Sequence, residues 1–236
     1  MKATSLKKIF LLIQLLLFIV FIILDVIGGN VLLSSSLKFT VIVLCLLYVI
    51  INKNKNHTRQ YLYLRYALTF TVVSDILLLF SDYYLFGVIT FVLAQQLYGM
   101  RISAMGNSRK KPIRDLLVRV LYQSIASIIV GIILWRMNLT VNALLLVSVF
   151  YFLSICVNVM GSLKLFTHYR ERRDIRYFTC GLILFLICDI NVGLFNMSEF
   201  LAMGPRYELI YQAASILMWA FYAPSQVLIA LSGDTI

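Results

Sequence analysis

Three of the ten acidic residues in this chain lie inside long apolar stretches: Asp25, Asp75 and Asp189. An aspartate at the centre of a membrane helix costs roughly 2.5–3.5 kcal/mol on insertion scales, so it needs a partner, a cavity or a function. Two carboxyls in a pocket of low polarity suit acid–base chemistry, because one can stay protonated near neutral pH while the other is ionised. We therefore take Asp75 and Asp189 as candidate catalytic residues, and Asp25 as an acid at a helix end.

Other polar side chains recur at helical spacing around the two deep carboxyls. Six of them are candidates for binding substrate or water: Gln95, Tyr98, Tyr222, Gln226, Asp82 and Asn196. A further polar stripe comprises Ser148, Tyr151, Ser154 and Asn158. The alternative for each of these residues is a hydrogen bond between helices, which contributes about 0.6 kcal/mol in a membrane. The pattern favours a polar hollow that both aspartates share.

The composition indicates which solvent surrounds the chain. Of its 236 residues, 61% are hydrophobic and 13% are charged. A soluble domain has about a quarter charged residues, so this chain lacks the polar side chains to cover its surface. Lipid is the expected solvent. We predict a single all-α transmembrane domain over residues 1–236.

Hydropathy and loop residues predict eight transmembrane spans. They cover residues 9–28, 35–51, 61–80, 84–104, 113–134, 139–160, 177–196 and 207–231. The first apolar run is longer than the hydrophobic part of a signal peptide, and no small-residue cleavage site follows it. We therefore expect it to be an uncleaved first helix.

The basic residues predict the orientation of the spans. They gather before the first span and in alternate loops, with Arg101 counted in the loop after the fourth span. The opposite side holds only Lys38, Arg136 and Arg206. Basic loops stay in the cytoplasm, so both termini are expected there. The same loops explain the net charge of +11 without a nucleic-acid partner, and they would contact anionic membrane lipids.

A short similarity between two of the predicted spans suggests an internal repeat. Ser74-Asp75-Ile76 in the third span is similar to Cys188-Asp189-Ile190 in the seventh. Because these two spans run in the same direction, the similarity is consistent with a parallel repeat of four plus four helices.

Metal-binding patterns are absent from the sequence. The four cysteines fall inside apolar runs without CxxC spacing, and the two histidines lie in basic loops without an HExxH motif. We expect no metal and no cofactor.

Two stretches resemble the lysoplasmalogenase (YhhN-like) family. The first is Ser74-Asp75-Ile76-Leu77-Leu78-Leu79, followed by Phe86-Gly87, Phe91 and Tyr98; the second is Gly181, Phe185 and Cys188-Asp189, then Phe200, and Tyr222-x-x-Ser225-Gln226-x-Leu228-Ile229. The resemblance covers about residues 60–231. The chain departs from the family pattern at Gln95, where the family has histidine, at Cys188, where it has serine, and at Pro224-Ser225.

The resemblance implies hydrolysis of the vinyl ether bond of a lysoplasmalogen, a single-chain phospholipid. The products would be a fatty aldehyde and a glycerophospho-base. The lipid would enter between helices with its headgroup at the outer boundary, near Asp82 and Arg206. A bacterial plasma membrane is the expected location.

Two other functions fit the same buried acids. A small proton-coupled transporter could use them as a proton relay. A noncatalytic lipid-binding relative of the family would fit the replacement of the histidine by Gln95. The oligomeric state is not indicated by any pattern in the sequence.

Overall fold

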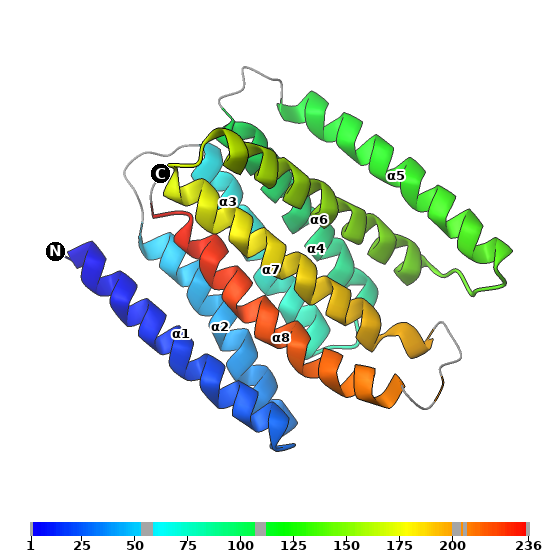
Figure 1. The fold of residues 1–236 in the computed structure, drawn as a ribbon, viewed down its shortest axis with the longest axis horizontal. Helices are drawn as coiled ribbons and strands as arrows, with labels where there is room; N and C mark the ends of the chain where they lie inside the picture. The colour runs from blue at the N-terminus through cyan, green and yellow to red at the C-terminus, as the bar shows by residue number, and fades with distance from the viewer. Residues whose placement is uncertain (1, 53–58, 107–111, 200–203, 205–206, 235–236) are drawn as a thin grey trace.

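The computed structural model describes residues 2–52, 59–106, 112–199, 204 and 207–234, and within these ranges it is helical without strands. Eight long helices follow one another along the chain (Figure 1): α1 (Lys2–Val26), α2 (Val31–Ile51), α3 (Arg59–Leu79), α4 (Tyr84–Met105), α5 (Pro112–Arg136), α6 (Ala143–His168), α7 (Arg173–Phe195) and α8 (Tyr207–Leu231). All eight are long and apolar enough to cross a membrane. The predicted all-α fold with eight spans is confirmed.

Several helix boundaries differ from the hydropathy prediction. The second helix begins at Val31 rather than residue 35, because Asn30 caps it and accepts a hydrogen bond from the Leu33 backbone N–H at 3.0 Å. The sixth begins at residue 143 rather than 139, where Asn142 accepts from the Leu145 N–H at 2.8 Å. Hydropathy follows apolar side chains, whereas the helix ends are set by capping residues and extend into polar segments.

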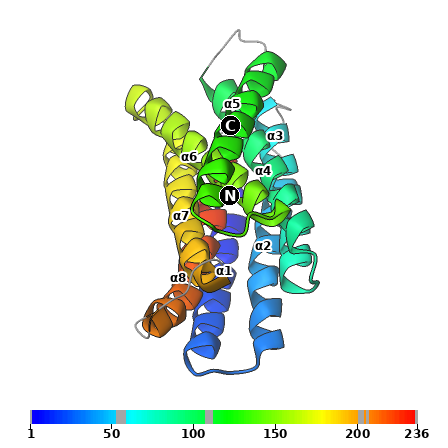
Figure 2. The same ribbon diagram turned by 90° about the vertical axis from the view of Figure 1, so that its right-hand side faces the viewer.

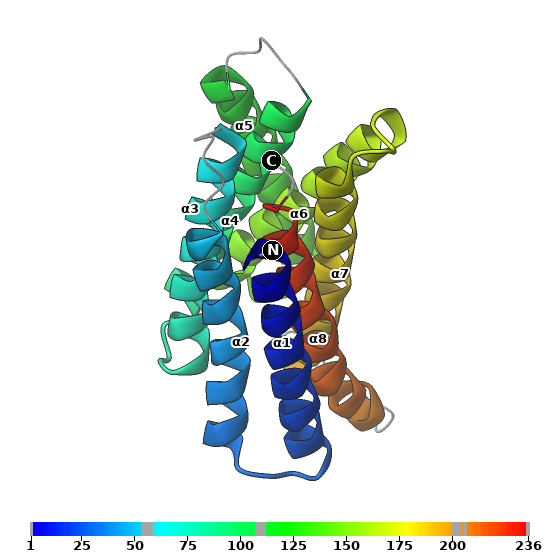
Figure 3. The same cartoon turned by 90° about the vertical axis from the view of Figure 1, so that its left-hand side faces the viewer.

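Six of the helices close into a ring. Each packs against the next in the order α2, α3, α4, α6, α7, α8, and α8 returns to α2. The other two helices lie outside this ring. α1 packs against α2 and α8 (Figure 3), and α5 packs against α4 and α6 (Figure 2). Side chains fill the ring, and this interior is where the buried polar residues of α3, α4, α7 and α8 can meet.

The helix packing has the pattern of a four-plus-four repeat. If each helix label is advanced by four, the pair α3–α4 becomes α7–α8, and α1–α2 becomes α5–α6. The pairs α2–α3, α1–α8 and α2–α8 likewise become α6–α7, α5–α4 and α6–α4, all of which pack. Asp75 and Asp189 each lie sixteen residues after the start of their helices, α3 and α7. This arrangement supports the repeat that the sequence similarity suggested.

The two ends of the chain meet at the same end of the bundle (Figure 1). The ammonium of Lys7 near the start of α1 lies 3.0 Å from the carboxylate of Asp234, just after α8. Asp234 also accepts hydrogen bonds from the Tyr48 hydroxyl at 2.7 Å and from the Asn52 amide at 2.6 Å. An even number of spans requires this arrangement. That this end faces the cytoplasm stays a prediction.

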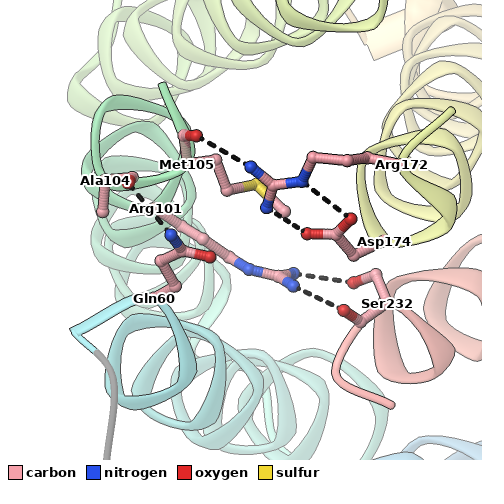
Figure 4. A network of polar contacts seen from close by, with 7 residues as sticks. All are labelled: Gln60, Arg101, Ala104, Met105, Arg172, Asp174 and Ser232. Atoms are coloured by element: carbon pink, nitrogen blue, oxygen red, sulfur yellow. Dashed lines mark hydrogen bonds and ion pairs between the residues drawn. The ribbon is translucent and has the colours of Figure 1, made fainter. Parts of the chain in front are cut away.

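Arg101 lies within α4 and is fully buried at this end of the ring, so its assignment to the loop after the fourth span was wrong. Its guanidinium donates to the Ser232 hydroxyl at 2.7 Å and to the Ser232 carbonyl at 3.0 Å, just past the end of α8 (Figure 4). It also lies 4.4 Å from the centre of the Phe178 ring. A cation is favourable at the C-terminal end of a helix, where carbonyl groups lack partners. Hydropathy does not indicate this role, because it does not show that a side chain within one span can reach the end of another helix.

Lys38 and Asp25 form an ion pair between α1 and α2. The ammonium lies 2.8 Å from the carboxylate, and both side chains are mostly buried. The ammonium also lies 5.0 Å from the centre of the Trp219 ring, and the Ser34 hydroxyl donates to Asp25 at 2.6 Å. Lys38 is therefore inside the second span rather than in an outer loop, since its charge is neutralised by Asp25 of the neighbouring helix.

The close contact of α7 with α8 depends on Gly181. A Cβ at this position would lie 3.0 Å from the Ser225 carbonyl oxygen and 2.7 Å from a side-chain carbon of Ile229. We expect Gly181→Ala to lower the free energy of unfolding by about 1–3 kcal/mol, because the two helices must separate. Unfolding of the purified protein in mixed detergent micelles would measure the change.

Gly193→Ala in the same helix is the matched control, since a Cβ there meets nothing within 4 Å. It should leave the protein as stable or slightly more stable, because alanine favours the helix over glycine. Equal loss of stability in both variants would contradict the packing role of Gly181.

Candidate functional site

Asp75 is buried in the ring and is bound by Tyr222 of α8. The Tyr222 hydroxyl donates to the carboxyl group of Asp75, with distances of 3.0 and 2.9 Å to the two oxygens. The preceding residue, Ser74, donates to the Gly87 carbonyl at 2.5 Å and so ties α3 to α4. A Cβ at Gly87 would lie 2.5 Å from a side-chain carbon of Leu78, so the glycine allows this close crossing. These contacts between α3 and α4 hold α3 in the position from which the Asp75 carboxyl reaches Tyr222 of α8.

Asp189 has an equivalent partner on α6. The Tyr151 hydroxyl donates to an Asp189 carboxyl oxygen at 2.9 Å. The same hydroxyl lies beside the Gln95 side chain of α4. Asp189 is half-buried, in contrast to Asp75, which is 3% exposed. The two carboxyls therefore have similar hydrogen-bond partners but differ in access.

Aromatic rings bring these two pairs into one cluster. The Phe91 ring of α4 lies 5.7 Å from the Tyr151 ring and 6.3 Å from the Tyr222 ring, measured between centroids. Phe185 of α7 lies 5.3 Å from the Tyr222 ring and 6.0 Å from Phe91. Both carboxyl–phenol pairs thus pack against a single phenylalanine. The two aspartates belong to the same part of the ring interior.

The hydrogen-bond donors at both carboxyls are uncharged. Three ion pairs form among the residues that the structure describes, and neither Asp75 nor Asp189 takes part in them. A phenol donates one hydrogen bond, and a carboxyl group can accept more than one. Each carboxyl therefore keeps capacity to donate or accept a proton, and no fixed cation holds it in the ionised form. This is an arrangement in which acid–base chemistry is possible.

Three other predicted site residues are buried near this cluster with unused polar atoms. Gln95, Tyr98 and Gln226 are each inaccessible to solvent. The Gln95 Nε2, the Tyr98 hydroxyl and the Gln226 Oε1 have no hydrogen-bond partner in the described part of the chain. A buried polar atom without a partner costs free energy unless a water or a ligand binds it. These atoms are suitable positions for water or for the oxygens of a bound molecule.

Asp82 and Asn196 do not join the cluster. Asp82 is exposed in the turn between α3 and α4. The Asn196 amide, at the end of α7, donates to the Val192 carbonyl of its own helix at 2.9 Å. Arg206, expected beside the headgroup, and Phe200 of the family motif lie outside the described residues.

Tyr151 is a site residue that the sequence pattern did not single out. It appeared only as a member of a polar stripe, in which its neighbours have other partners. Asn158 of the same stripe donates to the Gln95 Oε1 at 2.7 Å, and it is fully buried. The signal was present, because a tyrosine in line with buried amides needs a partner for its hydroxyl. Which acid it binds depends on the packing of α6 against α7, which the sequence does not give.

The described residues contain no group of three or more His, Cys, Asp or Glu side chains that could hold a metal ion. The four cysteines do not form disulfides.

Comparison with known proteins identifies the family. The model of the YhhN family matches residues 33–233. The chain belongs to the YhhN family. This family includes lysoplasmalogenases, and the predicted resemblance is confirmed. Neither a curated protein nor a solved structure matches the chain.

The YhhN match extends beyond the motifs found in the sequence to include α2. Within it, the departures from the family pattern have structural consequences. Gln95, in place of the family's histidine, contacts both Asn158 and the region of Tyr151. Cys188 is buried and directly precedes Asp189 in α7. Ser225, in the altered closing motif, donates to the Tyr222 carbonyl at 2.6 Å. Each departure adjoins the carboxyl cluster of this YhhN-family chain.

The Tyr151–Asp189 hydrogen bond can be tested by a substitution that keeps the ring. We expect Tyr151→Phe to lower the free energy of unfolding by about 1–2 kcal/mol, because the Asp189 carboxyl loses its donor. The contact with Phe91 is preserved. The control is Tyr66→Phe on the exposed surface of α3, which should change stability little. If both variants unfold alike, the Tyr151 hydroxyl contributes nothing to the folded state.

Proposed function

We propose that this YhhN-family protein hydrolyses the vinyl ether bond of a lysoplasmalogen or a related single-chain lipid. The proposal is supported chiefly by the pairing of Asp75 with Tyr222 and of Asp189 with Tyr151 around Phe91. Cleavage of an enol ether requires a proton donor and a base at one substrate, and the two carboxyls, whose tyrosine partners pack on one phenylalanine, are the candidates for these roles. The family includes lysoplasmalogenases, which supports the choice of bond.

The first step of the proposed reaction is protonation of carbon. One of the two carboxyls, in its neutral form, gives its proton to the β-carbon of the vinyl ether. The electron pair of the C=C bond forms the new C–H bond, and an oxocarbenium cation remains. The other carboxyl, ionised, stabilises this cation and takes a proton from a water as the water oxygen bonds to the cationic carbon. The product is a hemiacetal.

The second step is collapse of the hemiacetal. The first carboxyl, now ionised, removes the proton of the hemiacetal hydroxyl, and the carbonyl of the aldehyde forms. The bond to the glycerol oxygen breaks, and the second carboxyl returns its proton to that oxygen. Both carboxyls end in their starting forms, so the cycle needs one water and no cofactor.

The surrounding polar groups have positioning roles in this proposal. Tyr222 and Tyr151 hold the carboxyls, whereas Gln95, Tyr98 and Gln226 would bind the water or the glycerol oxygens through their unpartnered atoms. The half-buried Asp189 is the more accessible carboxyl, and it would meet the entering lipid first. We propose the plasma membrane of a bacterium as the location.

Removal of either carboxyl tests the proposal. We expect Asp75→Asn and Asp189→Asn each to lower aldehyde release by at least about 10²-fold, because an amide cannot donate or accept the proton. The assay measures aldehyde from ethanolamine and choline lysoplasmalogens with the purified protein. Asp82→Asn, at an exposed turn, is the matched control and should retain the wild-type rate. Full activity in either test variant would remove that residue from the mechanism.

Restoring the family's histidine gives a second test. We expect Gln95→His to raise the rate of aldehyde release by up to about 10²-fold, because an imidazole beside Tyr151 could transfer protons to the carboxyl region. The rate is compared with that of Gln96→His, one position along α4. An increase in Gln96→His alone would contradict the role of this position. If the natural chain and Gln95→His both bind lysolipid without releasing aldehyde, the protein is a noncatalytic relative.

A further inference from the structure

Outside the ring, the interface of α5 with α4 and α6 contains two hollows. One is a cavity of about 170 Å³ whose polar lining includes Gln96, Asp115, Arg119 and Asn158. The other is an open groove of about 330 Å³ with an apolar lining that includes Ile89, Val92, Ile128, Leu146 and Phe150. Both are lined by the same three helices. The polar cavity lies nearer the start of α5, and the apolar groove lies further along it.

Arg119 provides an unpaired positive charge in the polar cavity. Its Nη1 donates to the Asn158 Oδ1 at 2.7 Å and its Nη2 to the Ser154 carbonyl at 3.1 Å, while its Nε has no partner among the described residues. The guanidinium lies against α4 at Gly99, where a Cβ would be 1.6 Å from the Nη1. None of the ion pairs in the described part of the chain includes it. The neutral partners fix its position without neutralising its charge.

Asp115 provides the opposite charge in the same cavity. It lies one turn before Arg119 on α5, but the two side chains do not form an ion pair. A carboxylate and a guanidinium that line one cavity at separate positions match a ligand with separate positive and negative groups. A phosphate accepts two parallel hydrogen bonds from a guanidinium, and an ammonium group donates to a carboxylate.

Two buried amide side chains, Gln96 of α4 and Gln123 one turn after Arg119 on α5, form a pair at the same interface. The Gln96 Nε2 donates to the Gln123 Oε1 at 3.1 Å and to the Ser154 hydroxyl at 3.1 Å. This leaves the Gln96 Oε1 and the Gln123 Nε2 buried without partners among the described residues. One is an acceptor and the other a donor, which together suit a hydroxyl group of a ligand, since a hydroxyl both donates and accepts.

The order of these groups along α5 is that of a phospholipid. Asp115, Arg119, Gln123 and Ser127 recur every fourth residue on one helix face, about 6 Å apart along the axis. The last of them lines the apolar groove. Charge, amide and apolar surface therefore follow one another with depth, as ammonium, phosphate, glycerol and hydrocarbon do in a lipid.

We propose that the α4–α5–α6 interface binds a zwitterionic lysophospholipid. Its ammonium group lies at Asp115, its phosphate at Arg119, its glycerol at Gln96 and Gln123, and its chain in the groove at Ile128 and Phe150. The headgroup faces the end of the bundle that holds both termini. This binding site is outside the ring, and it holds whether or not the chain hydrolyses lipid.

Photocrosslinking of the purified full-length protein tests the site. The probe is lysophosphatidylethanolamine with a diazirine in its chain, and the attached peptides are identified by mass spectrometry. We expect labelling of the segments around Ile128 and Phe150. Arg119→Gln should weaken labelling by at least about tenfold, because the phosphate loses a charged hydrogen-bond donor. Arg114→Gln, at an exposed position on the same helix, should label like the natural protein.

Two further variants keep the test valid if Arg119→Gln folds poorly. Gly99→Ala should displace the guanidinium and weaken labelling, and Ile128→Trp should fill the groove and abolish it. Asp75→Asn should label normally, which separates this site from the proposed hydrolysis. Labelling spread evenly over the lipid-facing helices, or equal labelling of Arg119→Gln and Arg114→Gln, would overturn the proposal.

Competition by unlabelled molecules identifies the ligand chemistry. Lysophosphatidylethanolamine should compete about tenfold better than lysophosphatidylglycerol, which lacks the ammonium group, and Asp115→Asn should remove this preference. Equal competition by the two lipids at the natural protein would refute the zwitterion assignment. Competition by inorganic phosphate as strong as that of the lipids would show a site for free anions instead.

Discussion

The fold depends on the requirement that polar groups in a membrane find partners inside the protein. The six-helix ring meets this requirement by directing acids, amides and phenols from separate helices into one interior. Asp75 receives its hydrogen bond from α8, and Asp189 receives its bond from α6. Neither α3 nor α7 could bury its carboxyl without a donor from another helix. The chemistry of the site and the stability of the ring therefore rest on the same contacts.

The two ends of the ring differ in how they satisfy this requirement. At the end with both termini, charged groups close the interior: Arg101 binds the end of α8, and Arg172 pairs with Asp174 at 2.5 Å (Figure 4). At Asp75 and Asp189, the hydrogen-bond donors in the described part of the chain are the neutral phenols of Tyr222 and Tyr151. Among the described residues, no cation forms an ion pair with either of these two carboxyls.

The number of helices and the two aspartates could be predicted from the sequence, because both can be recognised from the order of residues along the chain without knowing how the helices pack. Apolar runs of sufficient length define spans, and an acid inside such a run stands out by its cost. The partners of these acids could not be predicted in the same way. Tyr151, Lys38 and Arg101 each act on a different helix, and their targets depend on how the helices pack. Helix ends shifted for a similar reason, since Asn30 and Asn142 set them through local hydrogen bonds that hydropathy does not record.

One amide joins the ring interior to the lipid-binding interface outside it. Asn158 accepts from Arg119 through its oxygen and donates to Gln95 through its nitrogen, both at 2.7 Å. Because each side of the amide has a partner of the opposite kind, its orientation is fixed. Gln95 lies beside Tyr151, which binds Asp189. Gln95, where the sequence motif led us to expect a histidine, therefore contacts Asn158 on one side and Tyr151 on the other. An amide at this position can hold the geometry of the contacts but cannot carry a proton at neutral pH, which makes Gln95 the residue on which the distinction between an enzyme and a lipid-binding relative depends.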